Sequence, residues 1–171
     1  MQRNFKLVIF ALIVIVTAIA AFNSYDSQFQ DTLEERTAYI QQQRPNAVIV
    51  SEITAEDCIV SELVDYDWLG YALFVPQNNQ RLRFQGSAYS QSDLFSDTLM
   101  HRNGHWHKAF FCKKPDLDAL EVIYVDDNGV AQTIRSENLQ GKTMVVQEEP
   151  DLISAQIFVT WYDTAGNAYT E

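Results

Sequence analysis

Three histidines, His101, His105 and His107 of HRNGHWH, form the only concentration of metal-ligand side chains in the sequence. If Asn103-Gly104 forms a two-residue turn, strand periodicity places His105 and His107 on one face and His101 on the other. If Arg102 joins a three-residue turn, all three histidines share a face and can bind zinc or copper. The alternative is a chance clustering at a polar hairpin tip, which needs no cofactor.

The two cysteines, Cys58 and Cys112, are expected to form a disulfide. The N-terminal segment indicates export from the cytoplasm, and exported cysteines are usually oxidised. Closing a loop of this length would stabilise the fold by about 4 kcal/mol. With Trp68 between them, the two cysteines resemble the Cys…Trp…Cys order of immunoglobulin domains, which implies a disulfide-bridged β-sandwich.

Motifs for catalysis are missing from the sequence. It has no GxSxG element, no glycine-rich phosphate loop, and only 6 glycines in total. The aspartates of Asp126-Asp127-Asn128-Gly129 and Asp163 lack the spacing of a calcium loop, and they predict turns instead. We therefore expect no enzyme activity, no catalytic residue, and no cofactor other than zinc or copper at the histidines.

An apolar run from Leu7 to Phe22 follows Arg3 and Lys6 and precedes an acidic stretch. This charge order predicts a cytoplasmic N-terminus, so residues 1–22 form a membrane anchor that crosses the bilayer through residues 5–22. The C-terminal domain would then be periplasmic, anchored to the inner membrane. The alternative is a signal peptide cleaved near Ala20, followed by secretion.

Residues 23–45 are predicted to form a helical stalk. From Ser24 to Arg44 the chain contains no glycine or proline, several apolar residues fall near one helical face, and Pro45 ends the pattern. Since nothing between Phe5 and Arg44 breaks a helix, the anchor and the stalk could form one rod of about 60 Å.

Residues 46–171 are predicted to form one antiparallel β domain. Short apolar or alternating runs are separated by turn residues, a pattern typical of a sandwich and unlike that of alternating strands and helices. The predicted strands are 47–53, 58–64, 69–75, 81–86, 93–100, 105–112, 119–125, 130–134, 142–147, 155–162 and 167–170.

A weak repeat at an offset of 37 residues predicts two similar hairpins near the C-terminus. Each would have an inward apolar and aromatic face and a turn opened by aspartate, although turn stereochemistry alone also selects Asp and Gly. The matching residues are Leu120, Val122, Tyr124, Asp126, Gly129, Ala131 and Thr133, which recur as Ile157, Val159, Trp161, Asp163, Gly166, Ala168 and Thr170.

The charge of the chain argues against nucleic-acid partners. All 23 acidic residues and 10 of the 12 basic residues lie beyond Phe22, so this part carries 10 − 23 = −13. Such a field repels DNA, RNA and anionic lipid, and it is compatible with cationic partners or simple solubility.

The first 75 residues or so resemble type IV pilin-like proteins, especially minor pilins and pseudopilins. The similarity lies in the start QRNFKLVIFALIVIVTAIAAF, the helix predicted to Arg44, and the strand WLGYALFV from Trp68 to Val75. Asn4 stands where the family has its processing glycine, and Ile9 where it has a glutamate. The resemblance implies assembly with other envelope proteins.

The fold predicted from the sequence is mainly β, with an N-terminal apolar helix continuing into or followed by a second helix and a disulfide-bridged sandwich. The predicted function is that of a membrane-tethered extracytoplasmic module that binds other envelope proteins without catalysis, in a pilin-like or secretion-associated assembly. The alternatives are a periplasmic partner of a membrane regulator, or a β domain that binds a metal or small ligand.

Overall fold

The structure is a computed structural model that describes residues 14, 15, 17, 29–102, 105–114, 116–150 and 154–170. In this part of the chain the predicted β-rich domain is confirmed, and each predicted strand range overlaps one observed strand. The elements are α2 (Leu33–Gln43), β1 (Val48–Ala55), β2 (Cys58–Asp65), β3 (Trp68–Pro76), β4 (Leu82–Ser90), β5 (Leu94–Arg102), β6 (His105–Cys112), β7 (Leu117–Asp126), β8 (Ala131–Ser136), β9 (Met144–Glu148), β10 (Ser154–Asp163) and β11 (Ala168–Thr170).

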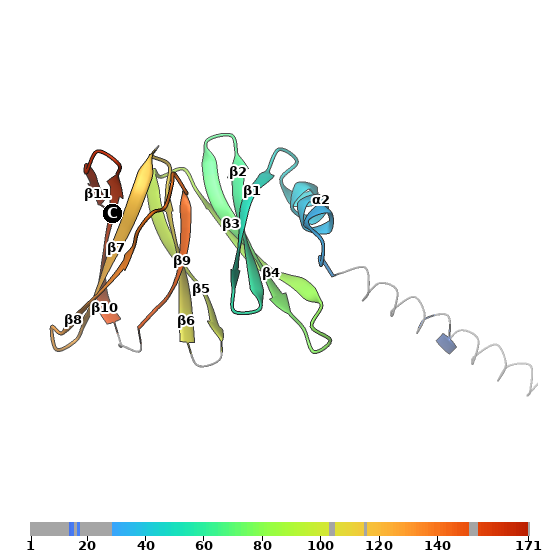
Figure 1. The fold of residues 1–171 in the computed structure, drawn as a ribbon. Helices are drawn as coiled ribbons and strands as arrows, with labels where there is room; N and C mark the ends of the chain where they lie inside the picture. The colour runs from blue at the N-terminus through green and yellow to red at the C-terminus, as the bar shows by residue number, and fades with distance from the viewer. Residues whose placement is uncertain are drawn as a thin grey trace, which may run out of the picture.

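The strands form three antiparallel sheets. The first sheet has the order β1-β2-β3-β4, the middle sheet β5-β6-β9, and the last sheet β11-β10-β7-β8. Figure 1 shows helix α2, the first sheet, the middle sheet and the last sheet side by side in that order. The domain is therefore a stack of four layers.

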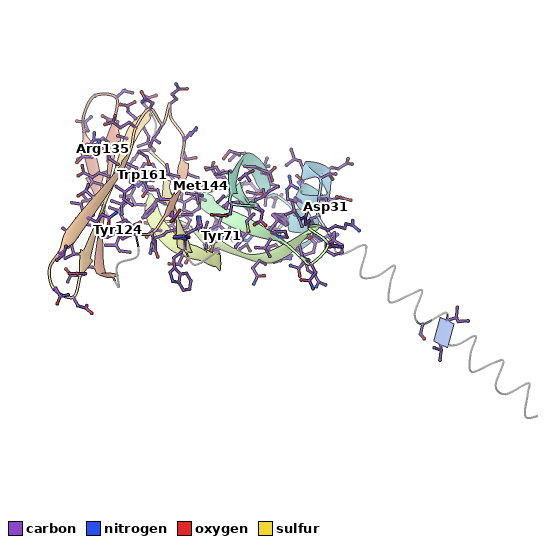
Figure 2. The ribbon with its side chains drawn as sticks, turned by 60° about the horizontal axis from the view of Figure 1, so that its bottom comes forward. Asp31, Tyr71, Tyr124, Arg135, Met144 and Trp161 are labelled. Atoms are coloured by element: carbon purple, nitrogen blue, oxygen red, sulfur yellow. The ribbon has the colours of Figure 1, made fainter. Side chains whose placement is uncertain are left out.

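The middle sheet is buried on both faces. Along β6, Ala109 and Phe111 pack toward the first sheet, while Phe110 and Cys112 pack toward the last sheet, and all four are 0% exposed. Alternate residues of a strand point to opposite faces, so the uninterrupted apolar run AFFC supplies two cores at once. Figure 2 shows Tyr71 and Met144 on the first-sheet side of this layer, and Tyr124 and Trp161 farther along the stack.

The fold therefore differs from the predicted β-sandwich in having three sheets. In a two-sheet sandwich each sheet has one face in the core and one face in solvent. The C-terminal half of β6 is instead buried on both faces.

The predicted disulfide is also wrong, because Cys58 and Cys112 are present as two buried thiols. Cys58 lies in the core between the first and middle sheets, whereas Cys112 lies in the core between the middle and last sheets. The middle sheet separates the two side chains, so the resemblance to the immunoglobulin disulfide fails. Trp68 is half-buried near the surface, and the fully buried tryptophan is Trp161.

Helix α2 begins abruptly at Leu33. Thr32 is its N-cap in an extended conformation, with φ −99° and ψ 157°, and forms a capping box with Glu35. Before it, Phe29 forms a β-bridge to Arg83. The predicted continuous rod from Phe5 is therefore wrong, because residues 29–32 are not helical. Of the predicted stalk over 23–45, the structure describes a helix at Leu33–Gln43.

An ion pair between Arg36 of α2 and Glu52 of β1 fixes the helix to the first sheet. The Arg36 guanidinium, on a residue 4% exposed, donates to both carboxylate oxygens of Glu52 at 2.8 and 2.7 Å, and Ser61 donates to the same carboxylate at 2.6 Å. Burial alone would raise the pKa of Glu52, but the hydrogen bonds from Arg36 and Ser61 and the charge of Arg36 lower it. The net stabilisation of the ionised carboxylate makes this pair an electrostatic attachment of the helix.

The predicted membrane anchor over residues 5–22 lies outside the described residues except for Val14, Ile15 and Thr17. Within the part of the chain that the structure describes, no helix has the length and apolar character needed to cross a bilayer. The inner-membrane anchoring and the location inferred from it are therefore corrected, because the structure gives them no support.

The last sheet contains the two similar hairpins that the repeat predicts. Val122 pairs with Val159, and the repeat partners around them pair symmetrically, which gives the sheet a local pseudo-two-fold axis. The two turns share the same backbone contacts, because the Asp126 carboxylate accepts from two backbone N–H groups and Asp163 does the same 37 residues later. These aspartates thus use their carboxylates to close turns, as the spacing predicts.

Candidate binding pocket between the first and middle sheets

A pocket of about 490 Å³ opens where the first and middle sheets meet at one end of the stack. The β2–β3 turn, the β4–β5 loop, the end of β6 and the start of β9 surround it, and we call it the seam pocket. It is lined by Val64, Tyr66, Asp67, Trp68, Leu69, Gln91, Asp93, Lys113 and Thr143. Its size is typical of ligand-binding sites, and its lining mixes aromatic, aliphatic and charged side chains.

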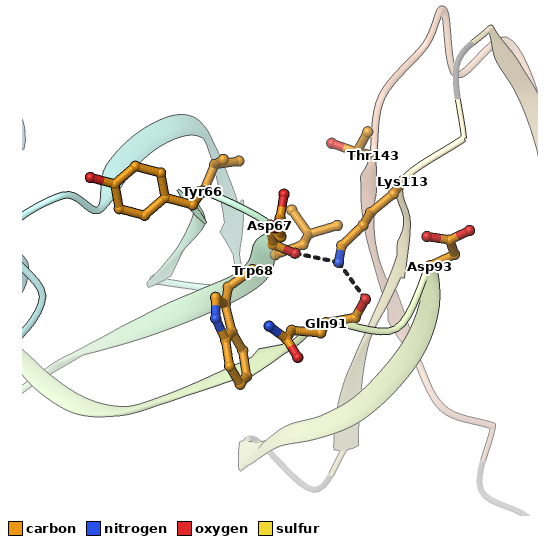
Figure 3. Close-up of a pocket in the computed structure, with 9 residues that line it drawn as sticks. Tyr66, Asp67, Trp68, Gln91, Asp93, Lys113 and Thr143 are labelled. Carbon is orange, nitrogen blue, oxygen red and sulfur yellow. Dashed lines mark hydrogen bonds between the residues drawn. The ribbon is translucent and has the colours of Figure 1, made fainter.

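Lys113 joins the two sheets beneath the pocket. Its ammonium donates to the backbone carbonyl of Asp67 at 2.6 Å and to that of Gln91 at 2.7 Å. Figure 3 shows these two bonds, which connect the residue directly after β6 to the β2–β3 turn and to the β4–β5 loop. Because both partners are backbone atoms, the pocket's rim is held in place while the side chains on it stay available.

Tyr66 is the most exposed large hydrophobic residue among those described, at 79%. It is the first of two residues in the β2–β3 turn, between the paired Asp65 and Trp68, and its φ is 53°. Residues other than glycine adopt this left-handed region at a cost of about 1–2 kcal/mol. Figure 3 shows the ring reaching outward from the turn, away from Lys113. The chain therefore keeps an exposed aromatic ring at a backbone position where glycine would be less strained.

Trp68, the neighbour of this turn, takes part in a second cluster. The Arg44 guanidinium lies 5.2 Å from the centre of the Trp68 ring and 3.9 Å from that of Tyr89, and it donates to the Asp65 carboxylate at 2.9 Å. Arg44 caps the C-terminus of α2, so the helix end, the turn and β4 are held together here. This contact restrains the position of Trp68 at the pocket.

The carboxyl groups around the pocket differ in their partners. Lys114 donates to Asp93 at 2.6 Å, and this hydrogen bond with the charge of Lys114 lowers the pKa of Asp93. Glu62, only 3% exposed, accepts hydrogen bonds from Ser51 at 2.5 Å and from Thr143 of the pocket wall. Among the described residues Glu62 has no basic partner, so an acidic group lies behind the pocket without a cation beside it.

Four polar groups on the rim have no partner among the described residues. They are the Tyr66 hydroxyl, the Asp67 carboxylate, the Trp68 indole N–H and the Gln91 side-chain amide. Tyr66, Asp67 and Gln91 belong to the turn and the loop that Lys113 holds in position, and Trp68 directly follows that turn. A ligand that entered the seam pocket would meet two aromatic rings and several uncommitted hydrogen-bonding groups.

The histidines lie at another hairpin. Across the β5–β6 hairpin, His101 pairs with Trp106 and Arg102 pairs with His105. His105 contacts Glu148 through Nδ1 at 2.8 Å, and His107 is 5% exposed with no partner for its Nδ1. No group of three metal-ligating side chains is placed to hold an ion in the described part of the chain. The metal site predicted at His101, His105 and His107 therefore stays a prediction, because part of this hairpin lies outside the described residues.

The sequence analysis missed the seam pocket because its lining comes from four separate segments. Trp68 was noted only for its order between two cysteines and for its place in a strand. One local signal was available, because Tyr66-Asp67 separates two predicted strands by a short connection that contains no glycine. A bulky residue in so short a connection is a reason to look for function at the turn.

Comparison with known proteins finds no match of this chain to a protein-family model, to a curated protein or to a solved structure.

Proposed function

We propose that this protein is a recognition module without catalytic activity, which binds a segment of another protein in the seam pocket. One observation carries the proposal. Tyr66 is 79% exposed and is held at a left-handed backbone position on the lip of a pocket of about 490 Å³. Strained backbone kept at an exposed aromatic residue is typical of functional surfaces.

The composition of the pocket supports a protein partner. Tyrosine and tryptophan are the residues that most often anchor protein interfaces, because they bury a large area and lose little conformational entropy. Tyr66 lies in the two-residue β2–β3 turn and Trp68 begins the strand that follows it, and Lys113 fixes that turn to the middle sheet. A preformed rim reduces the ordering cost of binding, which favours affinity from a small contact.

The proposal keeps the part of the predicted function that concerns binding to other proteins. It does not require a membrane tether, a disulfide or a metal ion.

A displayed library of random peptides tests this function. The full-length protein is immobilised, and peptides are selected on it after depletion on the double variant Tyr66→Ala, Trp68→Ala. We expect selected peptides that bind the wild type and lose at least tenfold in affinity on the single variants Tyr66→Ala and Trp68→Ala, which corresponds to about 1.4 kcal/mol. Trp106→Ala removes an aromatic ring that is 51% exposed on β6 and serves as the matched control.

The proposal fails if no selected peptide distinguishes the wild type from Tyr66→Ala, or if Trp106→Ala weakens binding equally. Folding of each variant is checked by its urea unfolding midpoint, so that loss of binding is separated from loss of structure.

A further inference from the structure

We infer that the seam pocket accepts a basic side chain, lysine or arginine, from the partner segment, and holds it between the Trp68 ring and the Asp67 carboxylate. This inference rests on the proposed function and adds the chemistry of the ligand. Four observations lead to it, three in the pocket and one in the charge of the whole domain.

The chain itself binds a guanidinium with the same pair of groups beside the pocket. Arg44 lies over Trp68 and Tyr89 and pairs with Asp65, the residue that precedes Tyr66. An aromatic ring and a carboxylate together favour a cation, because the ring face carries partial negative charge and the carboxylate supplies a full charge. Trp68 and Asp67 both line the pocket, so an aromatic residue and a carboxylate are again neighbours there, with the Trp68 ring already in contact with Arg44.

Negative charge in the pocket is left without a partner. The Asp67 carboxylate makes no hydrogen bond or ion pair with the described residues, and Glu62 lies behind Thr143 with hydroxyl donors only. Asp93 is neutralised by Lys114 at 2.6 Å. A basic ligand would therefore pair with Asp67 at the rim and would also benefit from the acidic group behind the wall.

Lys113 is the one group in the pocket that argues for an anionic ligand instead. Its ammonium, however, already directs two N–H bonds to the carbonyls of Asp67 and Gln91, at 2.6 and 2.7 Å. An anion would compete with those bonds, which hold the rim together. A cation at the Asp67 carboxylate leaves them intact, so a basic ligand preserves the structure that forms the site.

The negative net charge of the domain also favours a positively charged ligand. The part of the chain beyond Phe22 carries 10 − 23 = −13, so it attracts basic segments and repels acidic ones over a range set by the ionic strength. This field speeds encounter with a basic partner, and the pocket then selects one side chain of it.

The test follows the indole N–H resonances of the full-length protein by two-dimensional NMR, with the Trp68 signal assigned from a Trp68→Phe variant. The probes are N-acetyl-arginine amide, its uncharged isostere N-acetyl-citrulline amide, and the anionic N-acetyl-glutamate amide. We expect the arginine probe to shift the Trp68 signal with an affinity about tenfold higher than that of the citrulline probe.

The variant Asp67→Asn keeps the size of the side chain and removes its charge, and we expect it to weaken the arginine probe at least threefold. Asp57→Asn is the matched control, because Asp57 holds the corresponding second position of the two-residue β1–β2 turn. We expect that control to leave the affinity unchanged.

Equal binding of the arginine and citrulline probes, preferential binding of the glutamate probe, or an Asp67→Asn variant that binds like the wild type would each overturn the inference. The peptide selection separates its failure from that of the function. If the binding of the selected peptides depends on Tyr66 but the peptides share no basic residue, the inference of a basic ligand is refuted and the proposed protein recognition is retained. An absence of peptides that depend on Tyr66 refutes recognition itself.

Discussion

Replacing Tyr66 by glycine should stabilise the protein and abolish its binding activity. The φ of 53° costs a non-glycine residue about 1–2 kcal/mol, and glycine removes this cost. Glycine also gives the unfolded chain more freedom, which opposes the gain by about 0.5–1 kcal/mol. Because the Tyr66 ring is 79% exposed, little packing is lost. The expected net effect is a gain of about 0.5–1 kcal/mol in the free energy of unfolding.

The measurement is urea unfolding followed by far-UV circular dichroism, combined with binding of the selected peptides. Glu56 offers a matched control, since it holds the same first position of the β1–β2 turn with a φ of 57°. Glu56→Gly should give a similar gain in stability and leave peptide binding intact. If Tyr66→Gly lowers stability, or keeps full affinity for the peptides, then the strained tyrosine is not retained for recognition and our reasoning is refuted.

Three further predictions concern the fold. Arg36→Met leaves the Glu52 carboxylate without its cation and should lower the free energy of unfolding by about 3 kcal/mol, whereas Arg135→Met, at an exposed ion pair, should change it far less. Acid should weaken the same attachment. Since the folded pKa of Glu52 lies below its ordinary value of 4.5, its contribution is full above that pH and is lost as the pH falls through the lower folded value. The unfolding free energy of the wild type should therefore fall more steeply below pH 4.5 than that of Glu52→Gln. Gly129→Ala and Gly166→Ala, at φ of 77° and 82°, should each cost about 1–2 kcal/mol, and thermal unfolding should show similar losses if the two turns are equivalent.

The strands were predictable because each is a short run whose ends are marked by turn residues. The repeat was predictable for a similar reason, since Asp126 and Asp163 open turns whose geometry depends on local sequence only. Alternation along β6 also indicated which residues share a face. These features depend on contacts between residues that are close in sequence.

Long-range arrangement was not predictable in the same way. That Phe110 and Phe111 both lie in cores is visible as an apolar run, but the sequence does not say that separate sheets cover them. The prediction of a disulfide was wrong for this reason, because the spacing of Cys58 and Cys112 along the chain does not show that the middle sheet lies between them. The helix was extended too far because no glycine or proline marks its start, and the pairing of Phe29 with Arg83 of β4 is a long-range contact that the local pattern does not show.

The order in which the layers are completed has a consequence during synthesis. The first sheet is finished at Ser90, but the middle sheet that covers its inner face lacks its closing strand until Met144–Glu148 has been made. In between, the growing chain produces β7 and β8, which belong to a different layer. Until β9 has been made, β6 keeps an unpaired edge and the apolar residues Met144 and Val145 are missing from the two cores, which invites aggregation. Truncation before Met144 should leave a chain that depends on chaperones, since the middle sheet then lacks β9.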